Sequence, residues 1–126
     1  MLQSLSSTSI DSSTLPDIDW QRLNQLAGED ADFAVELLAM FLKDSEHSLA
    51  SVEEAIERRS PRALEEAVHA LRGASANVGA LKISAAAMQL EEMACEGQFE
   101  RASSLFQQLQ THFNELRKKL DVESTS

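Results

Sequence analysis

The sequence predicts an all-α protein, an antiparallel up-down-up-down four-helix bundle with a short extra N-terminal helix. Three observations lead to this fold class. The chain has only four glycines and two prolines, and alanine, leucine, glutamate and glutamine are abundant, which favours helices. Apolar residues recur at steps of three and four, and no segment alternates as a strand does. The segments between these patterns are short, so consecutive helices should be antiparallel neighbours.

The chain begins with a segment that lacks any periodic apolar pattern. Residues 1–16 are rich in serine and threonine, and we expect them to form a disordered leader or linker. A short helix is predicted from Asp19, its N-cap, to about Ala27, with Gly28 as its stop. The inner face of this helix is expected to consist of Trp20, Leu23 and Leu26.

A long helix is predicted next, from about Asp30 to Arg59. Ser60-Pro61 then marks a boundary, because serine is a preferred N-cap and proline is favoured at the first helical position. The helix that follows should stop at Gly79. The apolar face of the long helix is expected to contain Phe33, Leu37, Leu38, Phe41, Leu42, Leu49, Val52 and Ile56.

Two further helices complete the predicted bundle. One spans about Leu81 to Glu96 and stops at Gly97, and the last spans about Phe99 to Leu120. We expect residues 17–121 to form the four-helix bundle and residues 122–126 to be a frayed polar tail.

His69 has the most unusual setting of any residue in the chain. It lies off the apolar stripe of its helix and should therefore face solvent. Gly73 follows four residues later on the same face, although a glycine inside a helix costs about 1 kcal/mol relative to alanine. Ala76 is also small, and Arg72 places a cation three residues from the imidazole. This combination predicts a nucleophilic histidine that a bulky partner must approach.

The distribution of charge along the chain is uneven. The formal net charge of −10 argues against general nucleic-acid binding. The segment from Arg58 to Lys82 is nevertheless +3, because its five basic residues outnumber Glu65 and Glu66, and the remainder is −13. Either the clustering is chance, or the segment is a docking surface for an acidic partner or a phosphoryl group. The five basic residues are Arg58, Arg59, Arg62, Arg72 and Lys82.

Other features of the sequence concern where the chain acts. No apolar run approaches the ~20 residues of a membrane span, and the start lacks the basic and apolar regions of a signal peptide. The lone Cys95 excludes an internal disulfide and fits a reducing cytoplasm. We therefore expect a cytoplasmic protein, without a membrane partner, that acts as a monomer.

The residues around His69 resemble a known family. The run His69-Ala-Leu-Arg72-Gly73-Ala-Ser75-Ala-Asn-Val-Gly79-Ala is similar to the signature of histidine-containing phosphotransfer (HPt) domains. That signature reads His-x-Leu-Lys/Arg-Gly-small-small, then an apolar residue and Gly-Ala. The later Leu90-Glu91 and the upstream segment from Gly28 to Leu37 are also typical of the family. The resemblance covers about residues 17 to 120.

The resemblance implies a phosphorelay intermediate. His69 would accept a phosphoryl group from an aspartate of a receiver domain, in a response regulator or a hybrid histidine kinase, and pass it to another receiver. It implies no kinase or phosphatase activity, no cofactor and no metal ion in this chain, with magnesium supplied by the receiver. Physical reasoning assigns Arg72 to stabilise phosphoryl charge, Gly73 to give access, and Glu91 as a possible partner of the other ring nitrogen.

Two alternatives remain open at this stage. One is a helical interaction module that docks receivers without phosphoryl transfer. The other is a metal-binding bundle, for which Glu66-x-x-His69 has a suitable spacing but is single. Among the other titratable residues, His47 and His112 are expected to be solvated and Cys95 to be a packed, unreactive thiol.

Overall fold

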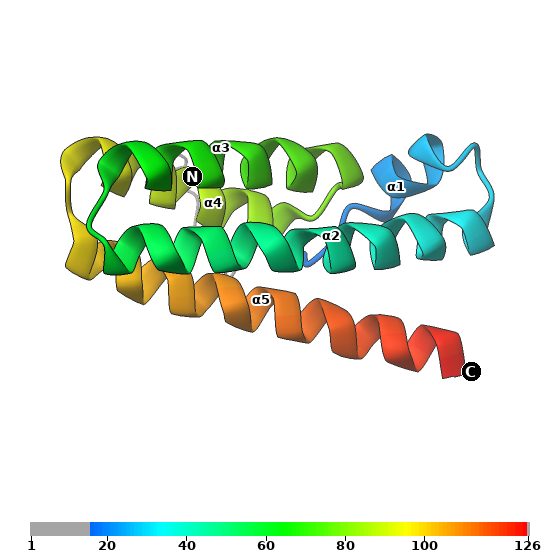
Figure 1. Cartoon of the computed structure of the whole chain (residues 1–126). Coiled ribbons are helices and arrows are strands. Elements are labelled where there is room, and N and C mark those ends of the chain that lie inside the picture. The colour runs from blue at the N-terminus through cyan, green and yellow to red at the C-terminus, as the bar shows by residue number, and fades with distance from the viewer. Residues whose placement is uncertain (1–15, 126) are drawn as a thin grey trace, which may run out of the picture.

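The computed structural model describes residues 16–125, with side chains described to residue 120. Within these residues the chain forms five α-helices and no strand (Figure 1). The predicted leader lies outside the described residues, apart from Pro16. The helices are α1 (Trp20–Leu26), α2 (Ala31–Glu57), α3 (Pro61–Val78), α4 (Leu81–Glu96) and α5 (Phe99–Thr125).

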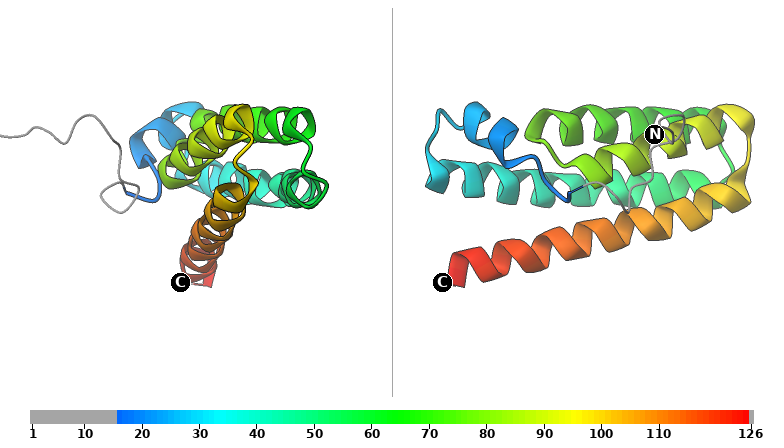
Figure 2. Two further views of the ribbon diagram at one scale, coloured as in Figure 1. Left: turned by 90° about the vertical axis from the view of Figure 1, so that its left-hand side faces the viewer. Right: turned by 180° about the vertical axis from the view of Figure 1, so that it is seen from behind.

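The four long helices form the predicted bundle, so the fold class is confirmed. Each packs against its neighbour in the sequence, and α5 returns to pack against α2, which closes the ring. The short α1 contacts α2 and α3 at one end of the bundle. The two views in Figure 2 show that the C-terminal part of α5 diverges from the other helices.

The helix starts follow the predicted capping residues. Asp19, Asp30 and Ser60 are the N-caps of α1, α2 and α3, and the side-chain oxygen of each accepts a backbone N–H three residues later. These bonds satisfy donors that a helix start otherwise leaves unpaired. Pro61 occupies the first turn of α3, as its fixed φ favours.

Gly79 is required both for its backbone angle and for its lack of a side chain. Its φ of 80° is in the left-handed region. A Cβ at this position would lie 3.0 Å from the carbonyl oxygen of Asp19. The backbone N–H of Asp19 donates to the carbonyl of Gly79 at 2.7 Å. This close approach attaches the start of α1 to the end of α3, the helix that carries His69.

The core is a single cluster of aliphatic and aromatic side chains from all five helices. The rings of Phe41 on α2 and Phe113 on α5 stack with their centroids 5.8 Å apart, a favourable aromatic arrangement. The largest fully buried apolar side chains of this core are Phe113, Leu23, Leu38, Leu64, Leu71, Ile83, Leu90, Leu109, Leu116, Val52 and Val68.

Some apolar residues that we expected to be buried are exposed. Trp20 and Leu26 are each 41% exposed, and Phe33 is 42% exposed. The short α1 covers only one end of the bundle and contacts two helices, so it buries one side, which is where Leu23 lies. Phe33 belongs to the first turn of α2, which extends beyond the end of α3 (Figure 1). The predicted inner faces of these two segments were therefore too wide.

The last helix is longer than predicted. The helix α5 continues through Thr125 instead of ending near Leu120, so the backbone of the predicted tail is helical in the structure. The segment after Leu120 contains neither glycine nor proline, and its polar residues alone do not stop a helix.

His112 also differs from its prediction, because its side chain is only 14% exposed instead of solvated. Neither ring nitrogen has a hydrogen-bond partner among the described residues, and Nδ1 lies 3.9 Å from Glu115 Oε1, too far for a hydrogen bond. Burial lowers the pKa of His112. His47, in contrast, is exposed as expected.

The buried imidazole predicts that stability falls on acidification. The folded state disfavours protonated His112, whereas the unfolded chain protonates near pH 6.5. Stability should therefore be lost as the pH falls through about 6.5. Urea unfolding at about pH 7.5 and about pH 5.5 should show a smaller loss for His112→Leu than for the parent. The matched variant His47→Leu should keep the parental loss, and an unchanged loss in His112→Leu would contradict the argument.

Candidate functional site

The helix α3 presents His69 on its solvent face. Its buried side consists of Leu64, Val68, Leu71, Ser75 and Val78, so a residue one position after Val68 is turned away from the core. The side chain of His69 is 74% exposed. The exposure that the sequence predicted is therefore present in the structure.

Gly73 lies one turn after His69 and is exposed. A Cβ added at Gly73 would have no heavy atom within 4 Å, apart from the local helix backbone. Its φ is not in the left-handed region. Neither packing nor backbone strain within this chain therefore requires a glycine here, which leaves access by a partner as the predicted reason.

Glu91 on α4 faces the His69 ring across the contact between α3 and α4. Its Oε2 lies 3.1 Å from Nδ1 of His69. Its other oxygen, Oε1, forms an ion pair with the guanidinium of Arg72. The Glu91 side chain is 19% exposed and that of Arg72 is 43% exposed. One carboxylate thus joins two of the predicted site residues, 22 and 19 positions away in the sequence.

These contacts determine the charge of Glu91 and the tautomer of the ring. The hydrogen bond from Arg72 is the main cause that lowers the pKa of Glu91; burial opposes it, and the bond with His69 adds to the lowering. An ionised carboxylate only accepts hydrogen bonds, so Nδ1 of a neutral His69 carries the proton. Nε2 of that tautomer then has the free lone pair and is the nitrogen that could act as a nucleophile.

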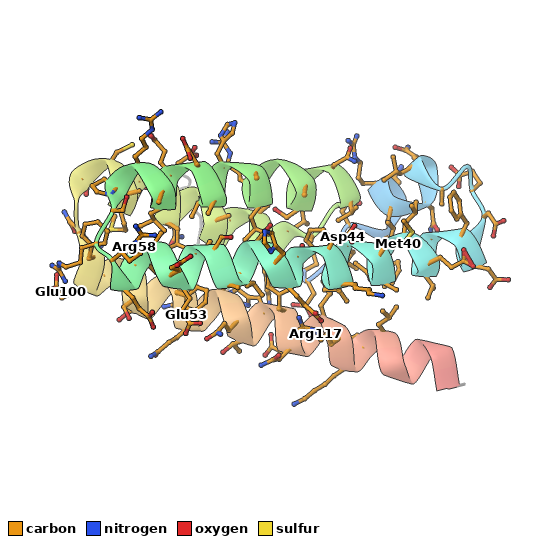
Figure 3. All side chains as sticks on the ribbon, in the orientation of Figure 1. Met40, Asp44, Glu53, Arg58, Glu100 and Arg117 are labelled. Carbon is orange, nitrogen blue, oxygen red and sulfur yellow. The ribbon has the colours of Figure 1, made fainter. Side chains whose placement is uncertain are left out.

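The basic segment identified in the sequence is not a free positive surface. Each of its basic residues is paired with a carboxylate, and three of those carboxylates come from a different helix or the segment before α1. The net charge of +3 is a sum over consecutive residues of the sequence. In the folded structure, acidic residues from distant parts of the sequence lie next to these basic residues and neutralise them. For example, Glu100 of α5 lies at the same end of the bundle as Arg58 (Figure 3), and it pairs there with the next residue, Arg59. The pairs are Arg58–Glu54, Arg59–Glu100, Arg62–Glu66, Arg72–Glu91 and Lys82–Asp17.

Lys82 also has a structural role that the sequence did not reveal. Its Nζ lies 3.1 Å from Asp17 Oδ1, and Lys119 of α5 pairs with the other oxygen of the same carboxylate. Burial favours the neutral form of Asp17, but the two lysines together outweigh it, so the pKa of Asp17 is lowered. Asp17 therefore ties the segment before α1 to α4 and α5. Lys82 therefore has a structural role in this ion pair, in addition to being one of the basic residues near His69 in the sequence.

Cys95 differs from its prediction in exposure. It was expected to be packed, but it is exposed, and its thiol donates a hydrogen bond to Glu65 Oε2 at 3.3 Å. This contact is the main cause that raises the pKa of the Cys95 thiol. Because the thiolate is the reactive form, Cys95 is expected to be unreactive despite its exposure.

The metal-site alternative lacks a ligand set in the part of the chain that the structure describes. Glu66 pairs with Arg62 at 3.4 Å, and no described group of three or more His, Cys, Asp or Glu side chains could hold a metal ion. Among the described helices, none is long and apolar enough to cross a membrane.

Sequence reasoning missed one contact near the site. Arg22 of α1 donates from Nε to the carbonyl of Asn77 at 3.2 Å and from Nη2 to Asn77 Oδ1 at 3.4 Å. Asn77 lies on the exposed face of α3, two turns after His69. The guanidinium thus caps one of the last carbonyls of α3. The two residues are 55 positions apart, so no local pattern could have indicated this pair.

Comparison with known proteins assigns the family. A model of the Hpt domain matches residues 36–119, which is more than half of the chain. Histidine-containing phosphotransfer protein 4 from Arabidopsis thaliana is 33% identical over 92 residues, or 71% of this chain and 72% of the relative. The chain therefore belongs to the Hpt domain family, as the signature around His69 indicated. Members of this family are phosphotransfer intermediates and not kinases or phosphatases.

Solved structures agree with this assignment. The crystal structure of histidine-containing phosphotransfer protein B from Pseudomonas aeruginosa PAO1 has a TM-score of 0.77 and 31% identity, and the match covers 87% of this chain and 96% of that chain. The HPT domain of a hybrid histidine kinase from Shewanella has a TM-score of 0.67 at 16% identity, over 87% of this chain and 96% of that chain. The second likeness shows the fold alone.

The open space at Gly73 makes a stability prediction. Gly73→Ala should raise the free energy of unfolding by about 1 kcal/mol, because alanine is the better helix former and its methyl group meets no neighbour. Gly79→Ala is the matched control and should destabilise, because the left-handed φ and the Asp19 carbonyl oppose a side chain. Urea unfolding measures both. A destabilised Gly73→Ala would mean that the glycine serves the fold.

Proposed function

We propose that this chain is a phosphorelay intermediate in which His69 accepts a phosphoryl group from a receiver-domain aspartate and passes it to another receiver domain. The observation that carries the proposal is an exposed imidazole whose Nδ1 faces an ionised carboxylate, which leaves Nε2 to react. The family of the chain supports a phosphotransfer role in general.

The proposed reaction needs little from this chain beyond position and charge. In phosphoryl transfer, catalysis is mostly alignment and neutralisation of the charge on the phosphoryl oxygens. The lone pair of Nε2 would attack the phosphorus in line with the departing aspartate oxygen. The receiver would supply magnesium and its own acidic pocket. This chain contains no nucleotide-binding motif, so we assign it no kinase or phosphatase activity.

Arg72 is proposed to neutralise the transferred group. Only one of its nitrogens is engaged with Glu91 in the structure, and the side chain is 43% exposed. The rest of the guanidinium fork is available to phosphoryl oxygens. The signature that the chain resembles allows lysine or arginine at this position; lysine would keep the charge but not the planar geometry.

The face of α3 around His69 is proposed as the docking surface for the receiver. Gly73 and Ala76 are both exposed, and their small size means that no large side chain projects from this face at these two positions. Met88 of α4 is 43% exposed and lies three residues before Glu91, so it borders the same face one turn away. Small residues with one apolar side chain would allow the receiver loops to reach Nε2. We further propose that the chain acts as a cytoplasmic monomer, in keeping with its lone cysteine.

The assignment of His69 is tested by transfer from a receiver phosphorylated with labelled phosphate. The parent should acquire label that is acid-labile and base-stable, as expected for phosphohistidine. His69→Gln should fold normally and take no label, whereas His47→Gln should be labelled like the parent. Label that persists on His69→Gln would refute the assignment. Receiver binding by the parent without any labelling would instead favour a docking module without transfer.

Arg72 should affect the rate of transfer. Arg72→Ala should slow transfer or shorten the phosphohistidine lifetime by about 10- to 100-fold, because a hydrogen bond to a charged group contributes about 1.5–3 kcal/mol. Arg72→Lys should retain much of the parental rate, because it keeps the charge. Single-turnover transfer to a receiver measures both variants. Equal rates and lifetimes in all three proteins would reduce Arg72 to a structural partner of Glu91.

A further inference from the structure

His112 on α5 is a buried titratable side chain that the proposed transfer does not use. Its side chain is 14% exposed, and neither ring nitrogen has a hydrogen-bond partner among the described residues. Buried polar groups are normally paired, because an unpaired one loses its hydrogen bonds to water. A neutral imidazole tolerates such a place better than an imidazolium does, and burial is the main cause that lowers the pKa of His112.

The charged groups around the ring come from three elements. Lys82 of α4 opposes protonation of His112, whereas Asp17, in the segment before α1, favours it. On α5 itself, Glu115 also favours protonation, but its Oε1 is 3.9 Å from Nδ1. Asp17 is already paired with Lys82 and with Lys119 of α5, a set of three residues that we call the Asp17 junction. An imidazolium at this place would thus be a third cation beside a carboxylate shared by two lysines.

The other helices meet different parts of the molecule. The helix α2 packs against another side of α5, where Glu46 and Arg117 line a groove together with Phe113. Within the described residues, α3 and α1 do not pack against α5. The side of α5 that carries His112 is therefore next to α4 and the segment before α1.

The segment before α1 is attached to the bundle by three consecutive residues. Asp17 connects it to α4 and α5, and Ile18 is buried in the core. The backbone N–H of Asp19 donates to the carbonyl of Gly79 at 2.7 Å. Because α1 itself packs against α2 and α3 only, these residues link α1 to the side of the bundle where His112 lies.

We propose that His112 and the Asp17 junction form an acid-sensitive latch. At neutral pH the latch holds residues 17–19 against α4 and α5, and protonation of the imidazole releases these residues together with α1, while the four long helices stay folded. The consequence concerns the exposed end of α3, where Arg22 of α1 contacts Asn77. In acid, α1 would no longer cover this end. The latch does not depend on phosphoryl transfer and goes beyond the proposed function.

The direction of the pH effect follows from the two states of the ring. Only the open segment lets an imidazolium reach water, where the ring protonates near pH 6.5. The closed segment is therefore fully favoured above about pH 6.5 and loses this advantage as the pH falls below it. Burial raises the pKa of Asp17, but the two lysines outweigh burial and lower it. Asp17 thus stays ionised over this range, and His112 is the group of the latch that titrates.

Hydrogen exchange at the backbone amide of Asp19 tests the latch, because this N–H is bonded to Gly79 in the closed segment. Its protection factor, corrected for the intrinsic exchange rate, should fall about three- to tenfold between about pH 7.5 and about pH 5.5, since one proton changes the opening equilibrium by at most tenfold per pH unit. His112→Leu should abolish this fall, whereas His47→Leu, at an exposed histidine, should keep it. A constant protection factor in the parent, or an undiminished fall in His112→Leu, would overturn the latch.

Low concentrations of urea separate a local opening from global unfolding. Opening of residues 17–19 and α1 exposes little surface, so exchange at Asp19 should depend weakly on urea, whereas exchange at the core amide of Leu109 should depend steeply on it. Equally steep dependence at both amides would mean that acid unfolds the whole bundle and that no latch exists.

A second variant keeps the test decisive if His112→Leu fails to fold. Asp17→Asn leaves the histidine in place but removes the charge that both lysines share. The Asp19 amide should then be several-fold less protected than in the parent at about pH 7.5, and its protection should still fall in acid. Parental protection in Asp17→Asn at about pH 7.5 would show that the junction does not hold the segment, which would refute the latch.

Discussion

The site depends on the packing of α3 against α4. This contact places a carboxylate of α4 between an imidazole and a guanidinium of α3. His69 and Arg72 are three residues apart on one helix, so the helical repeat alone puts them on neighbouring positions. In the structure, the second helix supplies the acceptor that contacts the ring. The buried aliphatic stripe of α3 and the apolar face of α4 thus determine the tautomer of a solvent-exposed histidine.

The rest of the fold keeps that helix pair in register. Gly79 lets the start of α1 approach the end of α3, where Asp19 and Arg22 bind the last carbonyls. Asp17 then connects the same segment to α4 and α5 through Lys82 and Lys119. Short polar links at the end of the bundle therefore restrain both ends of the turn between α3 and α4. The exposed faces of the helices can remain free for a partner because these restraints lie away from His69.

Local features of the sequence were sufficient to predict the helices, because caps and glycines act within a few residues. Asp30 and Ser60 begin their helices and Gly97 ends one as the sequence indicated. Features that depend on distant residues were not predictable in this way. The pairing of Arg59 with Glu100 and the burial of His112 arise only when helices meet. Glu91 was an intermediate case, because physical reasoning suggested it as a possible partner of the ring while periodicity alone would have left it solvated.

The charges of the site suit a group that arrives and departs with little reorganisation. Arg72 and Glu91 already neutralise one another in the structure. In the proposed transfer, the phosphoryl group would bring negative oxygens close to Arg72 and would make the ring positive next to Glu91. Under the proposed function, Arg72 would face the phosphoryl oxygens while it keeps its contact with Glu91. Preorganised charges of this kind stabilise developing charge without the cost of rearranging water, which favours a carrier that must load and unload reversibly.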